Sequence, residues 1–336
     1  MSVSLPEHYH SSLSVRDTEE AIKYIRDSFQ EAFAKKLHLS RISAPLFLPR
    51  NTGLNDDLNG VERPVAFDAK DLSGSTMEIV QSLAKWKRHA LQKYDFPVHD
   101  GLYTNMNAIR RDESLDAIHS IYVDQWDWEK VITHEERTIS FLEDTVQQIV
   151  EVIASMDHKV REQYSLDSEP LCDTVTFITS EALEALYPDL SAKQRENIFT
   201  KEHKCVFIEK IGWPLPLSNE PHDGRAPDYD DWSLNGDLLF WLPSLEIALE
   251  VSSMGIRVDE TSMVHQCIAA HCENRLVMEY HKQVLNRELP YTIGGGIGQS
   301  RLCMLLLNKA HIGEVQASVW PDAMIEDCHK RGIELL

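Results

Sequence analysis

Two pairs of strand-like segments, each joined by a connection of fewer than about a dozen residues, constrain the fold of this chain more than any other feature. The first pair is predicted over 102–109 and 119–126, and the second over 237–242 and 245–251, with a Pro-Ser turn between its strands. Parallel neighbours need a longer crossover, so both pairs are expected to be antiparallel. Helical patterns occur between the strand pairs, and no helix follows each strand in the regular order of β-α-β units. The sequence therefore predicts an α+β fold with an antiparallel β-sheet flanked by helices.

The remaining segments supply helices and loops around that sheet. The apolar segment 41–50 contains a proline that suits an edge strand. A Pro/Gly/Asp-rich stretch over 212–235 is interpreted as a lid. No linker or repeat divides the chain, so we expect one domain over 1–336, with a flexible N-terminal tail over 1–16. Helices are expected over 17–37, 77–94, 135–164, 260–273 and 275–287.

The segment 291-YTIGGGIGQSRLCMLLL-307 contains four glycines in five positions, followed by an arginine and an apolar run. It fits neither standard nucleotide-binding loop, because Gly298 is not followed by the Lys-Ser/Thr of a Walker A loop and the spacing departs from the dinucleotide fingerprint. We predict a strand over 291–293, a glycine turn, and a helix from about 297 whose first turn carries Arg301. The turn either brings main-chain N–H groups close to a phosphate or packs tightly against a neighbouring backbone. The glycines alone leave both interpretations open.

Composition excludes some classes of function. A formal net charge of −21 argues against the basic face that duplex nucleic acid requires, so no nucleic-acid partner is expected. No apolar run is long enough to span a bilayer, and MSVSLPEHYH lacks the features of a secretory leader, so we expect a cytoplasmic protein without membrane association. The six cysteines include no CxxC pair and are interpreted as reduced thiols. Small anions are not excluded, because a few local cations are sufficient to bind them.

Acidic residues of the second strand pair are candidate metal ligands. In paired alternating strands Asp237 and Glu250 can fall on one face, where two carboxylates suit Mg²⁺ held against phosphates. A solvated acidic face of the sheet explains the same pattern without a ligand. Arg257 follows Glu250 by seven residues, an odd number, so it reaches the same face only if a bend or short coil intervenes.

The first strand pair supplies a second group of polar residues. Arg110 lies at its rim, and in 119-HSIYVDQWDWE-129 Gln125 and Asp127 alternate to one side while the two tryptophans point to the other. This arrangement suits the floor of a binding site. It suits an amphipathic strand with one wet side equally well.

Two further segments are open to two interpretations. Lys85 and Lys87 are about 200° apart around a helix axis, so only one of them can face a pocket, and a solvated basic stripe is the simpler interpretation. The loop 225-RAPDYDDWS-233 places three carboxylates around aromatic residues. It suits recognition of an ammonium group or an ordinary surface turn.

Taken in order, the stretches LAKWKR, GLYT, YVDQWDWE, RAPDYDDW, EVSSMGIRV and TIGGGIGQSR resemble the ammonia-dependent asparagine synthetase (aspartate ammonia ligase) family. The resemblance extends from about residue 40 to about residue 320. It implies a catalytic core of the class II aminoacyl-tRNA synthetase type. It also implies ATP-dependent amidation of L-aspartate to L-asparagine with free ammonia, through β-aspartyl-AMP, with release of AMP and pyrophosphate.

The same resemblance implies roles for individual residues. Arg110 would grip the α-phosphate of ATP, Arg301 would stack on adenine, and Asp237 and Glu250 would hold Mg²⁺. Asp56 would lie near the β-carboxylate of aspartate and the ammonia site. The full sets implied are Asp56, Arg110 and Gln125 for catalysis; Ser82, Lys87, Gln125, Asp127, Asp230, Ser253 and Arg257 for aspartate; Arg110, Glu250, Gly296, Gly298 and Arg301 for ATP; and Asp237 and Glu250 for the metal.

The strand with Pro45 resembles the dimer-forming motif of class II cores, so a homodimer is expected.

Three rival functions fit the sequence less well. A tRNA synthetase needs an anticodon-binding domain, but the motifs already occupy nearly the whole chain and leave little room for one. A glutamine-dependent synthetase needs an N-terminal cysteine, whereas Ser2 follows Met1. A non-catalytic paralogue tends to lose motif arginines and metal acids, all of which are present. The chain departs from the family pattern at DDWSLNGD, where many bacterial members have a longer segment between DDW and LNGD. The lid is therefore expected to be shorter here.

Overall fold

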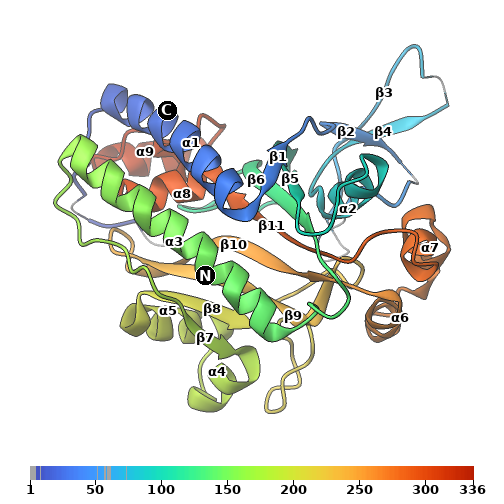
Figure 1. Cartoon of the computed structure of the whole chain (residues 1–336). Coiled ribbons are helices and arrows are strands. Elements are labelled where there is room, and N and C mark those ends of the chain that lie inside the picture. The colour runs from blue at the N-terminus through green and yellow to red at the C-terminus, as the bar shows by residue number, and fades with distance from the viewer. Residues whose placement is uncertain (1–4, 8, 51, 57, 59–61, 73) are drawn as a thin grey trace.

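The computed structural model contains a large β-sheet that runs through the centre of the molecule (Figure 1). In spatial order its strands are β1 (Leu39–Arg41), β5 (Gly101–Ile109), β6 (Tyr122–Val131), β11 (Thr292–Gly298), β10 (Ile247–Arg257), β9 (Asp230–Leu242), β8 (Cys205–Glu209) and β7 (Thr176–Thr179). The outer pairs β1·β5 and β7·β8 are parallel, and the pairs from β5 across to β8 are antiparallel. A small sheet has the order β2 (Phe47–Pro49), β4 (Thr76–Ile79), β3 (Ala66–Asp68). The structure describes residues 5–7, 9–50, 52–56, 58, 62–72 and 74–336.

Helices surround the large sheet. The α-helices are α1 (Val15–Leu37), α2 (Ala84–Lys93), α3 (Ile139–Tyr164), α4 (Ser180–Leu186), α5 (Ala192–His203), α6 (Glu260–Ala269), α7 (Glu279–Leu285), α8 (Gln299–Leu306) and α9 (Asp322–Lys330). Two short 3₁₀ helices are η1 (Glu273–Val277) and η2 (Ile312–Glu314). This mixture of an antiparallel centre with flanking helices confirms the α+β fold class.

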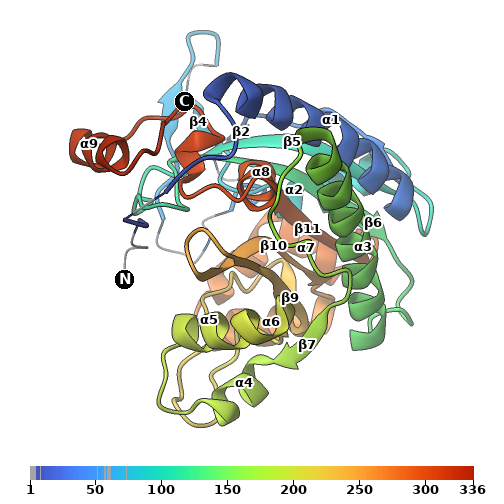
Figure 2. The ribbon, with the colours of Figure 1, turned by 90° about the vertical axis from the view of Figure 1, so that its left-hand side faces the viewer.

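The long helices α1 and α3 lie side by side over one face of the sheet (Figures 1 and 2). The Ser14 side chain caps α1 by accepting a hydrogen bond from the N–H of Asp17 (3.2 Å), which satisfies a backbone donor at the helix start. Phe29 and Phe33, one turn apart, are fully buried and contact the tryptophans of β6: the Phe29 and Trp126 rings are 4.7 Å apart between centroids. The dry face of the sheet is therefore fixed by aromatic packing.

The opposite face is covered only in part. Neighbouring residues on a strand point to opposite faces: Leu238 of β9 packs in the cluster under α1 and α3, while Leu239 packs with Phe199 of α5 and Leu183 of α4. On β5, Leu102 packs against α2 in the same way. Helices α2 and α5 thus cover two separate parts of this face. The centre of the face, formed by β6, β11 and β10, lies between them.

The sequence located most elements correctly. The predicted helices over 17–37 and 135–164 are α1 and α3, and both predicted strand pairs are present as β5·β6 and β9·β10. All six cysteines are free thiols, as expected. Among the described residues no helix combines the length and the apolar content needed to cross a membrane.

Five predictions were wrong in part, and in the first three pairing with a distant strand overrides local preference. Residues 77–79 begin the predicted helix over 77–94 but belong to β4, which pairs with both β2 and β3. The last six residues of the predicted lid belong to β9. The glycine turn is the strand β11, and the edge strand over 41–50 is divided, with the segment holding Pro45 lying between β1 and β2. The predicted helices over 260–273 and 275–287 are three shorter ones, α6, η1 and α7.

The segment before α1 contacts the C-terminal region. Tyr9 donates a hydrogen bond to Glu314 (3.0 Å), and Arg331 donates to the carbonyl oxygen of Leu5 (3.1 Å). Helix α1 begins at Val15, so the last two residues of the predicted N-terminal tail belong to this helix.

Glu209, at the end of β8, gives a test of these buried positions. Burial raises the pKa of Glu209 to about 7, and the negative charge of Glu143 adds to the shift. The folded state therefore holds a proton that the unfolded state has lost between about pH 4.5 and pH 7, and folding stability must fall as the pH rises through that window. This carboxyl lowers the free energy of unfolding by on the order of 3 kcal/mol as the pH rises through the window, and Glu209→Gln should remove that loss.

Urea denaturation at pH 4.5 and pH 8 measures this effect. The matched control is Glu202→Gln, which changes an exposed glutamate on the neighbouring helix α5 and should keep the parent's pH dependence. Equal pH dependence in Glu209→Gln and the parent would contradict the assignment.

Candidate active site

The floor of the candidate site is built from three adjacent strands, β6, β11 and β10. In the register of β6 and β11, Gln125, Asp127 and Glu129 lie opposite Gly298, Gly296 and Gly294. Alternation along a strand sends all of these positions to one face, away from α1 and α3. A row of polar side chains thus lies beside three positions of β11 that carry no side chain.

The glycines of β11 provide space rather than a turn. None of Gly294, Gly295, Gly296 and Gly298 has a positive φ angle, so their backbone is open to any residue. A Cβ atom at Gly294 would lie 2.6 Å from the carbonyl oxygen of Trp128 and 2.7 Å from Nη2 of Arg257. A Cβ at Gly296 would collide with the Gln125 side chain. The bare strand lets long side chains from both neighbouring strands lie across it.

A β-bulge on β10 brings Glu250 and Arg257 to this face. Glu250 pairs with Leu239 of β9, but Ser252 pairs with Leu238, so one extra residue is inserted between them. An extra residue reverses the alternation of side chains beyond it. Glu250 and Arg257, seven positions apart, therefore lie on the same face. The sequence predicted that this would need an irregularity between them, and the bulge provides it.

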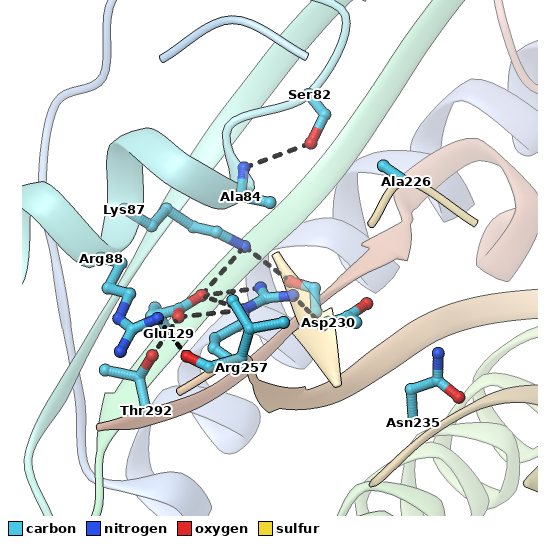
Figure 3. Close-up of polar contacts among 12 residues, drawn as sticks. Ser82, Ala84, Lys87, Arg88, Glu129, Ala226, Asp230, Asn235, Arg257 and Thr292 are labelled. Atoms are coloured by element: carbon cyan, nitrogen blue, oxygen red, sulfur yellow. Dashed lines mark hydrogen bonds and ion pairs between the residues drawn. The ribbon is translucent and has the colours of Figure 1, made fainter. Parts of the chain in front are cut away.

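Arg257 is the centre of a buried ion-pair network at the deep end of the floor (Figure 3). Its Nε and Nη2 donate to the Glu129 carboxylate at 3.0 and 2.7 Å, and its Nη1 forms an ion pair with Asp230. Thr292 donates a further hydrogen bond to Glu129 (2.6 Å). A buried charge is stable only when paired and hydrogen-bonded, and every partner here comes from a different strand.

Lys87 enters the same network from α2 (Figure 3). Its Nζ forms an ion pair with Asp127 and donates to the carbonyl oxygens of Trp128 (2.9 Å) and Gly295 (3.1 Å). Lys85, two residues earlier, forms a buried ion pair with Asp228 (2.9 Å). Both lysines are buried, so the interpretation of a solvated basic stripe was wrong, although only Lys87 lines the cavity.

Burial and pairing compete in setting the pKa values of this network. Burial raises the pKa of Glu129, but Arg257 and Lys87 oppose it strongly enough that the pKa lies below its ordinary value. For Asp230, burial outweighs the pull of Arg257, and its pKa is raised. Burial lowers the pKa of Lys87 against the charge of Asp127. Burial lowers the pKa of Arg257, but the charges of Glu129 and Asp230 outweigh it and hold the pKa well above its ordinary value, so Arg257 remains charged.

A cavity of about 390 Å³ lies above this floor. It brings together twelve of the fourteen residues implied by the family resemblance. Those implied for aspartate line it, namely Ser82, Lys87, Gln125, Asp127, Asp230, Ser253 and Arg257, as do those implied for ATP, namely Arg110, Glu250, Gly296, Gly298 and Arg301.

Asp56 and Asp237 are buried but do not line the cavity in this structure. Burial raises the pKa of Tyr229, a lining residue, and the negative charge of nearby Asp56 adds to this shift. Asp237 is covered by Arg225, whose Nη2 forms an ion pair with it.

The residues present fit a divalent cation. Asp237 and Glu250 supply hard oxygen ligands, and the buried Oδ1 of Asp237 has no hydrogen-bond partner in the described part of the chain. Burial raises the pKa of Asp237 to about 6, with the negative charge of Glu250 adding to the shift and Arg225 opposing it. Added positive charge at this position would relieve both carboxylates. No cluster of three or more His, Cys, Asp or Glu side chains suited to a metal occurs among the described residues.

Sequence reasoning missed two functional candidates. Glu129 continues the alternation of Gln125 and Asp127 by one more step, so the signal was present in the same stretch. Arg225 stands in the loop whose carboxylates drew attention instead. Asp228 is one of those carboxylates, but its buried partners Lys85, His281 and Arg275, at 2.9, 2.9 and 3.3 Å, are too far away in the sequence for any local pattern to relate them.

Comparison with solved structures places this fold among class II aminoacyl-tRNA synthetases. An asparaginyl-tRNA synthetase of Entamoeba histolytica, in complex with asparaginyl-adenylate, aligns with a TM-score of 0.61 and 14% identity over 90% of this chain and 66% of that chain. That of Pyrococcus horikoshii, also complexed with asparaginyl-adenylate, aligns with a TM-score of 0.62 and 15% identity over 91% and 70%. At such identities the likeness concerns the fold.

The family follows from sequence. A family model described as aspartate-ammonia ligase matches residues 16–332. An aspartate–ammonia ligase of Limosilactobacillus fermentum is 59% identical over all of both chains, and one of Pediococcus pentosaceus is 58% identical over the same extent. This chain belongs to the aspartate–ammonia ligase family.

The role of the bare strand can be tested by adding one methyl group. Gly294→Ala places a Cβ against backbone and the buried Glu129–Arg257 pair, so we expect the free energy of unfolding to fall by about 2–3 kcal/mol. The matched control is Gly298→Ala on the same strand, where the added Cβ meets only the flexible Arg301 side chain at 3.2–3.6 Å and should cost less than about 1 kcal/mol. Denaturant unfolding of both variants measures the difference, and equal losses would refute the close-approach argument.

Proposed function

We propose that this protein joins free ammonia to L-aspartate at the expense of ATP, forming L-asparagine, AMP and pyrophosphate through a β-aspartyl-AMP intermediate. The observation that carries the proposal is the cavity of an aspartate–ammonia ligase family member in which Lys87, Arg257 and Arg110 meet the acidic residues Asp127 and Asp230. Such an arrangement matches aspartate, which carries two carboxylates and one ammonium group.

The aspartate substrate would bind over the deep floor. Arg257 offers its planar guanidinium to a carboxylate, and Lys87 supplies a second cation nearby. Asp127 and Asp230 then turn toward the substrate ammonium. Because Arg257 is fixed by the two oxygens of Glu129, it can exchange Asp230 for a substrate carboxylate without losing its position. Ser82, Gln125 and Ser253 complete the lining with neutral hydrogen-bonding groups.

ATP would bind at the end of the cavity where β11 continues into α8. Arg301 lies in the first turn of α8, and its Nη1 donates to the Glu250 carbonyl oxygen (3.0 Å), which orients the guanidinium plane for stacking on adenine. Gly296 and Gly298 leave room for the nucleotide beside the strand. Arg110, at the rim of β5, would contact the α-phosphate. The solved synthetases that contain asparaginyl-adenylate share this fold, which supports an adenylate intermediate.

The chemical difficulty of the first step is the repulsion between two anions. An oxygen of the β-carboxylate attacks the α-phosphorus, the bond to the bridging oxygen breaks, and pyrophosphate leaves with the electron pair. Fixed positive groups at the place where charge accumulates lower this barrier without reorganisation. Mg²⁺ held by Asp237 and Glu250 would neutralise phosphate charge when bound.

Ammonia would complete the reaction at the activated carbonyl. Its nitrogen attacks the acyl carbon, the bond to the AMP oxygen breaks, and the surplus proton of nitrogen goes to a nearby base. Asp56 is a candidate for this base because it is buried and electrostatically coupled to Tyr229 at the cavity wall. Gln125 would hold the acyl phosphate in position.

The proposal extends to the organisation of the protein. Twelve of the implied site residues line one cavity, although they come from the large sheet, from α2 and α8 and from connecting segments, which supports a single catalytic domain. Leu46, Phe47 and Phe67 are exposed apolar residues on and beside the small sheet, with the Phe47 and Phe67 rings 5.2 Å apart between centroids. An exposed apolar group of this kind supports association of two copies as a homodimer.

The products distinguish this reaction from its rivals. Incubation with aspartate, ammonium, Mg²⁺ and α-labelled ATP should yield labelled AMP and asparagine in equal amounts. Omission of ammonium should stop turnover while aspartate-dependent exchange of pyrophosphate into ATP continues. Labelled ADP in place of AMP would refute the adenylate route, and absence of all turnover with bound ATP would favour a non-catalytic paralogue.

The role of Asp56 in the second step is separable from the first. Asp56→Asn should lower asparagine formation by about a hundredfold or more while leaving aspartate-dependent pyrophosphate exchange near the parent level, because only ammonia activation needs the base. Asp71→Asn, which changes an exposed aspartate nearby in the sequence, serves as the control and should leave both rates unchanged. Parallel loss of the two activities in Asp56→Asn would overturn this assignment.

A further inference from the structure

Arg225 is a cavity-lining cation that neither the family resemblance nor the proposed mechanism assigned. It lies on the segment before β9, and its guanidinium is directed at Asp237, one of the two carboxylates proposed as metal ligands. Its Nη2 forms an ion pair with Asp237, and its Nη1 donates to the carbonyl oxygen of Gly224 (2.9 Å) and lies 3.7 Å from Asp223. The side chain is 11% exposed.

The guanidinium of Arg225 occupies the position that suits a divalent cation. Its charge acts on both Asp237 and Glu250, and it covers the carboxylate of Asp237 from the cavity side. Two cations cannot share two carboxylates at contact distance, since they repel each other strongly at that separation. A metal ion at Asp237 therefore requires Arg225 to leave.

Arg225 is held by fewer side-chain contacts than Arg257. Its buried Nε has no hydrogen-bond partner within the described residues, unlike the nitrogens of Arg257, which all have carboxylate partners. The backbone on its C-terminal side is fixed, because the carbonyl oxygen of Ala226 accepts from Trp232 (3.2 Å) and that of Pro227 accepts from Gln266 (3.0 Å). Release thus needs rotation of one side chain and no movement of the following loop.

We propose that Arg225 occupies the cation position at Asp237 and Glu250 in the ligand-free protein and turns to the β- and γ-phosphates when the metal arrives with the nucleotide. The nucleotide half of this statement rests on the proposed function. A planar guanidinium fits phosphate oxygens in a bidentate manner, so the phosphates compensate Arg225 for the lost carboxylate. The consequence is that metal and nucleotide bind together, and that metal alone binds weakly.

The test measures binding of Mn²⁺, used in place of Mg²⁺, by electron paramagnetic resonance at pH 8 without nucleotide. Arg225→Met removes the competing cation and should tighten Mn²⁺ binding at least tenfold. Arg225→Lys keeps the charge and should leave this affinity near that of the parent. Arg287→Met, which removes an arginine paired with Glu260 far from the cavity, is the matched control and should change nothing.

A second measurement addresses the nucleotide. Binding of a non-hydrolysable ATP analogue with Mn²⁺, followed by calorimetry, should weaken at least tenfold in Arg225→Met. Asp237→Asn should abolish the gain in Mn²⁺ affinity when combined with Arg225→Met, which ties the effect to this carboxylate. Circular dichroism and thermal unfolding check that each variant is folded. If Arg225→Met does not fold, Arg225→Lys provides the test, because it should weaken binding of the ATP analogue and leave Mn²⁺ affinity unchanged.

The outcomes separate this proposal from the proposed function. Two results would overturn the exchange of Arg225 between carboxylates and phosphates. One is an unchanged Mn²⁺ affinity in folded Arg225→Met. The other is parent-like affinity for the ATP analogue in both Arg225 variants. Failure to form asparagine would count against the proposed reaction, but Mn²⁺ binding without nucleotide would still test the position of Arg225.

Discussion

The ion pair between Arg257 and Glu129 is the interaction on which the rest of this structure depends. Burying two charges costs several kcal/mol for each ion, and removal of one partner leaves the other uncompensated. The pair persists because Glu129 uses both carboxylate oxygens on the guanidinium and also accepts a hydrogen bond from Thr292. These groups come from β6, β10 and β11, so the network forms only when all three strands are in register.

Two backbone features make this network geometrically feasible. The bare positions of β11 let the Arg257 and Glu129 side chains meet across a strand that would otherwise separate them. The bulge on β10 turns Glu250 to the face on which Arg257 lies. Aromatic packing of Trp126 and Trp128 against α1 fixes the same strands from behind. The dry face thus provides rigidity, and the wet face provides charge.

Three cations that line the cavity are paired with carboxylates in this structure. Lys87 is paired with Asp127, Arg257 with Asp230, and Arg225 with Asp237. Such pairing keeps cations ionised and correctly placed in a buried site, because an isolated buried charge would be neutralised instead. Although the chain has a net charge of −21, these three cations therefore line one cavity.

The sequence by itself determined the strand pairs, the long helices and, through the family resemblance, twelve of the residues that line the cavity. It did so because alternation along β6 and helical periodicity in α1 are local patterns that survive without a partner. Only the tertiary structure decided that the glycine run is a central strand, that the lid ends in β9, and that Asp228 joins Lys85 to His281. Pairing with distant segments decides these features, and a glycine or a buried lysine carries no local sign of the neighbour that it will meet.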